Sequence, residues 1–160
     1  MRLITIAFGL VLFGFSLLGC ASYEYSGKAI STIEYTTVDY FGEYTHVTII
    51  DLENGEVLHR EFFPTDEIIP DYEVIYTFDV TEVDSFLNQF DASGVFEMKD
   101  EYDTDEHIDD GGGWTLTINY QDGTFKTSTG DNFWPSDIFE KADVATVDLY
   151  GDDLFGTGRN

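Results

Sequence analysis

The chain has 160 residues and a formal net charge of −25 at pH 7, with 32 acidic residues against 7 Lys and Arg. A surface of this charge repels nucleic-acid phosphates and anionic lipid headgroups, so the composition argues against nucleic-acid binding and favours basic protein partners or cations. The same excess of acid is also typical of halophile proteins. A salty habitat and a basic partner are both consistent with this composition.

The first 19 residues have the layout of a secretory signal peptide. They carry one positive charge, at Arg2, no acid, and an almost unbroken apolar run that ends in small residues. An uncleaved spanning helix is the alternative, because about 20 apolar residues are enough to cross a bilayer. The residues that follow the run favour export and cleavage.

Leu17, Leu18, Gly19 and Cys20 resemble the lipobox of bacterial lipoproteins. The resemblance implies that Cys20 is lipidated, becomes the first residue of the mature chain, and receives a diacylglyceryl group and often a further acyl chain. Two or more acyl chains anchor a protein stably. We therefore expect an exported protein held on a bacterial membrane by Cys20, with no disulfides, since Cys20 is the single cysteine.

The sequence predicts one globular domain. We assign residues 1–19 to the signal peptide, 20–28 to the lipidated cysteine and a tether, 29–155 to the domain, and 156–160 to a flexible tail. A domain of this length buries roughly two thirds of its unfolded surface, which is enough for a real core.

Two segments predict β-hairpins. Residues 45–52 and 56–63 alternate apolar and polar residues around Asn54-Gly55, which favours a type I′ turn that pairs residue 50 with 59 and 46 with 63. Residues 114–120 and 124–130 flank Asp122-Gly123, a turn that pairs Tyr120 with Phe125 and Leu116 with Thr129. This register places one set of side chains on the core face, namely Trp114, Leu116, Ile118, Tyr120 and Phe125, and leaves Thr115, Thr117, Asn119, Lys126 and Ser128 on a wet face.

The remaining elements are two strands and two helices. Residues 29–40 and 72–80 are rich in β-branched and aromatic residues and predict strands. Residues 81–94 predict a helix that Thr81 caps and Gly94 ends. Residues 135–151 predict a second helix, which begins near Pro135, ends before Gly151 and has an apolar stripe at Ile138, Ala142, Ala145 and Leu149. The predicted class is α+β, an antiparallel sheet of about five to six strands with two helices packed on one face.

The part of the chain from Thr81 to Gly151 resembles a group of uncharacterised domains in bacterial secreted lipoproteins. The matching residues are mostly turn and cap positions, namely Gly94, Val95, Phe96, Tyr102, Asp109, Trp114, Asp122, Gly123, Gly130, Asn132 and Pro135. The resemblance implies the same fold and carries no activity.

The acidic segment from Asp100 to Trp114, "DEYDTDEHIDDGGGW", is the first candidate metal site. Counted from Asp103, it does not fit a calcium-binding EF-hand loop, because His107 takes position 5, Ile108 position 6 and Trp114 position 12. An irregular, weak calcium site built from Asp103, Asp105, Asp109 and Asp110 is a hypothesis. A solvated connection is the favoured interpretation, since salt and water screen the repulsion between exposed carboxylates.

His46, His59 and Glu61 are the second candidate. They fall on one face of the first predicted hairpin, and His59 and Glu61 have the spacing of some zinc ligands. The predicted register separates His46 from His59 and offers no obvious third ligand. Polar residues on a mostly wet sheet face are therefore the favoured interpretation.

No motif identifies a reaction. The chain has no G-x-S-x-G motif, and with 32 acidic residues any carboxylate pair can be drawn, so such pairs carry no information. We expect a non-catalytic binding module for a basic envelope protein, for example a hydrolase such as lysozyme. The alternatives are a weak calcium-binding domain using residues 103–110 and a small envelope hydrolase. A pocket that gathers His59, Glu61 or the 103–110 acids would favour the enzyme.

Overall fold

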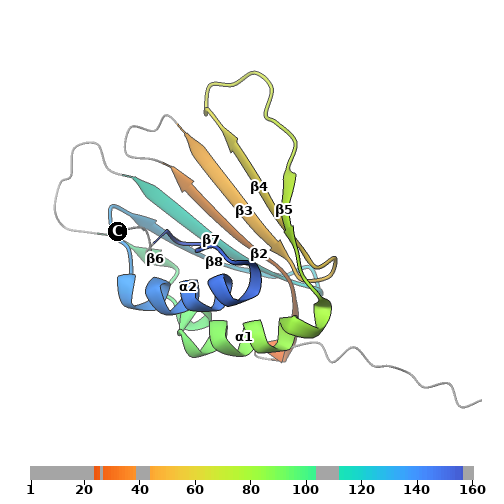
Figure 1. Cartoon of the computed structure of the whole chain (residues 1–160). Helices are drawn as coiled ribbons and strands as arrows, with labels where there is room; N and C mark the ends of the chain where they lie inside the picture. The colour runs from red at the N-terminus through yellow and green to blue at the C-terminus, as the bar shows by residue number, and fades with distance from the viewer. Residues whose placement is uncertain (1–23, 26, 39–43, 104–111, 157–160) are drawn as a thin grey trace, which may run out of the picture.

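A computed structural model of the chain describes residues 24–25, 27–38, 44–103 and 112–156. The fold is α+β (Figure 1). Two short 3₁₀ helices, Val80–Glu82 and Val95–Glu97, flank the first helix. In chain order the other elements are β1 (Glu24–Tyr25), β2 (Lys28–Val38), β3 (Thr45–Asp51), β4 (Glu56–Phe62), β5 (Glu73–Thr77), α1 (Val83–Ala92), β6 (Glu101–Tyr102), β7 (Gly113–Tyr120), β8 (Phe125–Asp131) and α2 (Ser136–Tyr150).

The strands form one sheet in the order β5-β4-β3-β2-β7-β8-β6, and β1 pairs with the start of β2. Every described pairing is antiparallel except the one between β6 and β8. The sheet is thus mixed, and it has more strands than the five to six antiparallel ones predicted. The additional strands β1 and β6 are two residues long, too short to leave an alternating pattern. β1 lies inside residues 20–28, the predicted tether.

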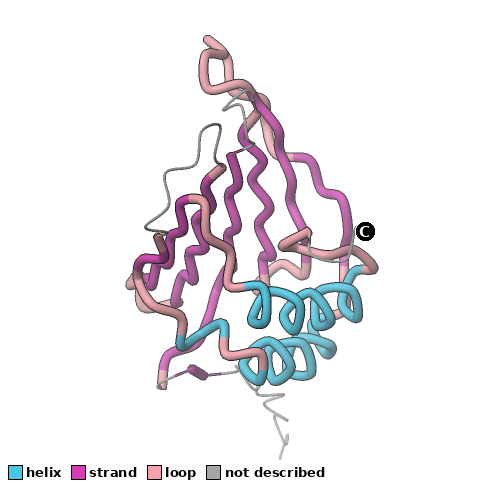
Figure 2. Tube along the Cα trace, turned by 90° about the vertical axis from the view of Figure 1, so that its left-hand side faces the viewer, coloured by secondary structure: helices cyan, strands magenta, loops and turns pink. Residues whose placement is uncertain are grey.

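Both helices pack against the same face of the sheet, as predicted, and the strands extend past them at one end (Figures 1 and 2). The hydrophobic core lies between these two layers. Its fully buried side chains include Phe90 from α1, Phe139 from α2, and Ile33 and Leu116 from the centre of the sheet. Burial alternates along β7, which is the pattern of a strand with one face on a core.

The register of the β7–β8 hairpin differs by one residue from the predicted one. Gly123 has φ +81, its N–H donates to the Tyr120 carbonyl, and the Tyr120 N–H donates to the Thr124 carbonyl. This is a three-residue loop, a type I turn followed by a left-handed glycine, rather than the expected two-residue type I′ turn. Leu116 therefore pairs with Ser128 instead of Thr129.

A slip of one residue moves every side chain of a strand to the opposite face. The predicted core position of Phe125 was wrong, since that side chain is 67% exposed, and the predicted wet position of Ser128 was wrong, since it is 2% exposed. Lys126 also lies on the helix side, where its ammonium donates to the Phe96 carbonyl. The faces predicted for β7 itself are confirmed.

The register of the β3–β4 hairpin differs by two residues from the predicted one. The loop has four residues, 52–55, in which the Gly55 N–H donates to the Asp51 carbonyl and the Asp51 carboxylate accepts from the Glu53 and Asn54 N–H groups. Residue 50 therefore pairs with 57 rather than 59, and 46 with 61 rather than 63. A slip of two keeps each side chain on its predicted face but changes its neighbours across the strands.

Helix α1 starts differently from the prediction. The cap belongs to the 3₁₀ turn ahead of it, where the Asp79 carboxylate accepts from the Thr81 N–H, so the predicted cap at Thr81 was wrong. Gly94, with φ +87, follows the helix as expected.

Helix α2 largely follows its prediction. It ends at Tyr150, before the left-handed Gly151, and the predicted stripe at Ala142, Ala145 and Leu149 is buried. Phe139 is fully buried, whereas Ile138, predicted for the stripe, packs only partly against the core.

Candidate functional site

The predicted lipidation site and most of the predicted calcium ligands lie outside the described part of the chain. These are Cys20, with the rest of the lipobox from Leu17, and the acids Asp105, Asp109 and Asp110. Asp103, the fourth predicted calcium ligand, is described and exposed. The lipid anchor and the calcium site therefore stay predictions. In the described part of the chain, no helix is both long and apolar enough to cross a membrane.

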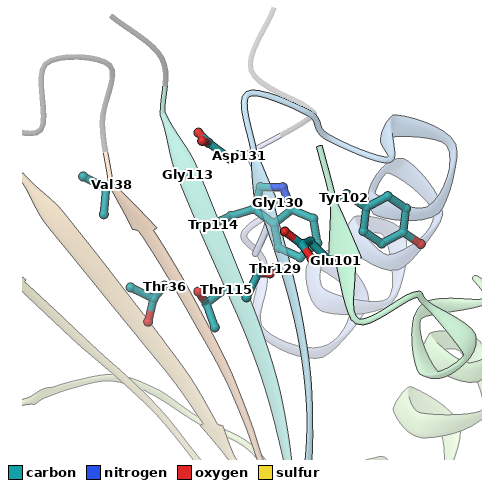
Figure 3. Close-up of a pocket in the computed structure, with 10 residues that line it drawn as sticks. All are labelled: Thr36, Val38, Glu101, Tyr102, Gly113, Trp114, Thr115, Thr129, Gly130 and Asp131. Carbon is teal, nitrogen blue, oxygen red and sulfur yellow. The ribbon is translucent and has the colours of Figure 1, made fainter. Parts of the chain in front are cut away.

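A pocket of about 280 Å³ lies where β6 ends and β7 begins, at the two described ends of the acidic segment (Figure 3). Figure 3 shows the Trp114 indole beside Gly130, and this indole donates to the Phe133 carbonyl at 2.7 Å. The carboxylates of the pocket are Glu101 and Asp131, and the other lining residues are mainly threonine, glycine and apolar. Among the described residues, no group of three metal-ligating side chains gathers here.

A larger pocket, of about 410 Å³, gathers His46, His59 and Glu61. All three lie on the helix side of the sheet, the face that also carries the buried residues Ile50 and Val57. His46 is the second residue of β3 and Glu61 is next to last in β4, so both lie at the strand ends that extend past the helices (Figure 1). The rest of the wall includes Asp152, Asp153 and neighbouring residues from the segment after α2.

The geometry of this cluster contradicts the prediction that His46 and His59 lie too far apart to act together. The three side chains offer ligand atoms that all lie within 4.8 Å of one another. His46 Nδ1 lies 3.3 Å from Glu61 Oε2, and the two imidazole centroids are 6.1 Å apart with 28° between the ring planes. The two-residue change in register is the reason: it puts Glu61 directly opposite His46 and makes His59 a diagonal neighbour.

Two buried tyrosines line the same pocket. Burial raises the pKa of Tyr35, although the Trp134 indole partly offsets the effect, and burial likewise raises the pKa of Tyr150 against a smaller opposing effect of Thr146. The Tyr35 hydroxyl forms no hydrogen bond of ordinary geometry with a described residue. Both phenols therefore stay protonated at neutral pH and contribute no charge to the pocket wall.

Two imidazoles and a carboxylate are a donor set suited to a transition-metal ion with open coordination positions. The cluster of His46, His59 and Glu61 is the one group of at least three such side chains that comes together within the described ranges. The pocket beside it is large enough for a small ligand. Binding of a metal ion or a small molecule is thus the chemistry that this arrangement supports.

The segment 63–77 contains β5, which lies within the strand predicted at residues 72–80, but the sequence did not mark the segment as a functional region. Every residue in it is exposed except Tyr72, which is half-buried. Its exposed large apolar side chains are Phe63, Ile68, Ile69, Val74, Ile75 and Tyr76. Its charges are Asp66, Glu67, Asp71 and Glu73, with no Lys or Arg. The residues of β5 look like those of a buried strand in the sequence, and only its place at the edge of the sheet exposes them.

No family model, no curated protein and no solved structure matches the chain. The resemblance to secreted-lipoprotein domains therefore stays a prediction.

Proposed function

We propose that the protein is a lipoprotein anchored to a bacterial membrane through Cys20, whose domain binds a protein partner with a basic surface. The observation that carries this proposal is the segment 63–77. It combines exposed apolar side chains with acidic residues, and no basic ones, at the edge of the sheet, in a chain of net charge −25. The predicted signal peptide and lipobox support the location.

An exposed apolar edge strand favours association with another chain. Soluble proteins usually protect such edges with lysines, bulges or a covering segment, because the unpaired backbone groups can pair with a strand of another molecule. The pairing of β5 with β4 has one irregularity, a register shift between Val57 and Leu58, but β5 carries no lysine. Among the described strands, β4 is the partner of β5, and none pairs with its outer edge. Exposed apolar side chains that cluster beside acids are typical of an interaction surface.

Charge selects among the possible partners. The acids of the segment, Asp66, Glu67, Asp71 and Glu73, attract a basic surface and repel an acidic one, which includes a second copy of this chain. Because such forces weaken with salt, binding should be strongest at low ionic strength. A binding role of this kind needs no catalytic residue.

Binding of the purified full chain to lysozyme, as a defined basic probe, tests this proposal. Two double variants with the same change in net charge are compared. The first carries Glu67→Lys and Glu73→Lys in the segment, and the second carries Glu97→Lys and Glu140→Lys at exposed positions elsewhere. We expect the first pair to weaken binding about tenfold more than the second, because local charge and apolar contact act together. Equal losses in both variants would mean adsorption by net charge alone and would overturn the proposal, as would tight binding of an acidic protein of similar size.

The pocket favours a second candidate function, a small hydrolase of the cell envelope. An enzyme of this kind needs a pocket that gathers candidate catalytic groups, and the 410 Å³ pocket gathers both His59 and Glu61. The test is turnover of ester, phosphoester and glycoside reporter substrates by the full chain. Activity that Glu61→Gln abolishes while the unfolding midpoint is kept would support this candidate. No turnover in any of the three classes would remove it.

A further inference from the structure

We propose that His46, His59 and Glu61 form a binding site for one transition-metal ion of the zinc class. The proposal is independent of partner binding by the segment 63–77. It deepens the hydrolase candidate, since a metal ion would supply that chemistry, but it is tested by binding rather than by turnover. The metal site can therefore fail without affecting partner binding, and a chain without hydrolase activity can still bind the metal ion.

The sheet holds the three ligands in place. His59 and Glu61 are two residues apart on β4 and so point to the same face, while His46 lies directly across from Glu61 on β3. Ligands on two paired strands are more precisely positioned than ligands on a loop. The segment after α2 closes the site from the other side, through Asp152 and Asp153.

One distance between ligand atoms already suits a zinc ion, and the others need a small closure. Zinc binds imidazole nitrogen at about 2.0–2.1 Å and carboxylate oxygen at about 2.0–2.2 Å in a tetrahedral arrangement, which puts neighbouring ligand atoms about 3.4 Å apart. His46 Nδ1 and Glu61 Oε2 are already 3.3 Å apart. The longest separation in the group is within 4.8 Å, so a closure of roughly 1.5 Å is needed, which side-chain rotation can supply at half-exposed residues.

A neighbouring hydroxyl orients one of the ligands. The Thr48 hydroxyl oxygen lies 3.1 Å from Nδ1 of His59, and Thr48 is the residue directly opposite His59. When Nδ1–H donates to this oxygen, Nε2 carries the lone pair that a metal ion accepts. Hydrogen bonds of this type fix the tautomer and the ring orientation of metal-binding histidines.

The donor set selects the class of ion. Calcium and magnesium prefer sites made of oxygen atoms, whereas two imidazoles with one carboxylate suit zinc and its neighbours in the first transition series. Three protein ligands leave a fourth position open toward the pocket, where water, a pocket carboxylate or a ligand can bind. The strongly acidic surface raises the local concentration of any divalent cation.

Calorimetric titration of the chelator-treated full chain with zinc tests the proposal. We expect binding of one zinc ion per chain, and a loss of affinity of about 100-fold or more in His46→Ala, His59→Ala and Glu61→Gln, since even residues that only support the ligands contribute 10- to 100-fold. The matched control is His107→Ala, the third histidine of the chain, which should bind zinc like the unchanged protein. Circular dichroism of each variant verifies that the fold is kept.

Each other outcome of the titration contradicts the proposal. No binding of zinc at a concentration of about 0.1 mM would remove the site, because structural and catalytic zinc sites bind far more tightly. Loss of binding in His107→Ala but not in His59→Ala would place the ion in the acidic segment instead. Displacement of zinc by an equal concentration of calcium would show an oxygen-based site, which is the earlier calcium hypothesis rather than this one.

Discussion

The two hairpins of the sheet differ in what covers their inner face. The inner face of β7 packs against the helices, and its residues Trp114, Leu116 and Ile118 are 1–3% exposed. The inner face of β3 and β4 is buried only near the loop, at Ile50 and Val57, and is half-exposed at His46 and Glu61. Beyond it, β5 is exposed along its whole length. We infer that the half of the sheet around β7 supplies most of the stability, while the half formed by β3, β4 and β5 is available for binding.

The largest effect should follow from Phe139→Ala. The Phe139 side chain is fully buried and contacts the rings of Phe155, Trp114 and Tyr35 at centroid distances of 4.1, 5.0 and 5.9 Å. Its removal should lower the free energy of unfolding by about 3–5 kcal/mol, measured by urea denaturation. The control Phe133→Ala, at a side chain that is 41% exposed, should cost about 1 kcal/mol. Similar losses in both would contradict a core centred on β7 and α2.

A smaller loss of stability is expected for Gly130→Ala. A Cβ atom at residue 130 would lie 2.2 Å from the Trp114 indole nitrogen and 2.6 Å from the Phe133 carbonyl oxygen. Because the indole is held by its own hydrogen bond to that carbonyl, the added methyl forces a shift in a packed region and should cost about 1–3 kcal/mol. Thermal unfolding with tryptophan fluorescence measures both the loss and the change around the indole. An unchanged midpoint and spectrum would show that this edge of the core is loosely packed.

In the segment 63–77, a substitution should change binding and leave stability almost unaltered. Ile68 is 85% exposed, so Ile68→Lys should change the free energy of unfolding by no more than about 0.5 kcal/mol. The same variant should weaken the binding of lysozyme, because it removes an apolar contact and adds a positive charge. Paired urea denaturation and binding measurements test both expectations. A loss of stability well above this limit would mean that Ile68 packs against part of the domain.

The smallest effect concerns the pH dependence of the β7–β8 turn. Hydrogen bonds from the Thr124 hydroxyl and N–H, with a further contribution from Lys28, lower the pKa of Asp122 from 3.8 to about 2. A lowered pKa in the folded state means that the Asp122 carboxylate stabilises the fold above pH 4 and that this contribution is lost as the pH falls from about 4 to about 2. Asp122→Asn should therefore be less stable than the unchanged chain at pH 6 and approach it near pH 2. A stability difference that stays constant over this range would contradict the assignment.

The sequence predicted the elements better than it predicted how they pair. Both hairpins were expected at the right places, but each loop was longer than the two-residue turn that Asn54-Gly55 and Asp122-Gly123 favour. Aspartate side chains and a left-handed glycine stabilise these longer loops, and the same Asp-Gly or Asn-Gly pair is compatible with several loop lengths. One extra residue exchanged the faces of β8, whereas two extra residues left the faces of β3 and β4 unchanged.

The candidate site was predicted in part for the same reason. His46, His59 and Glu61 were correctly placed on one face, but the distances among them depend on the register, which the sequence did not define. Asp152 and Asp153 carry no local signal, because they reach the pocket only when the chain after α2 returns over the sheet. The exposure of β5 is likewise a property of the whole sheet.

Hydrogen–deuterium exchange of the full chain, with and without lysozyme, tests the central claim most directly. Without a partner, we expect slow exchange in β7 and α2 and fast exchange in the segment 63–77. With lysozyme at low salt, exchange should slow in the segment 63–77 and stay unchanged on the outer surface of the helices. Protection that appears on α1 and α2 instead, or equally over the whole surface, would contradict the assignment of stability to the β7 half of the sheet and of binding to the segment 63–77.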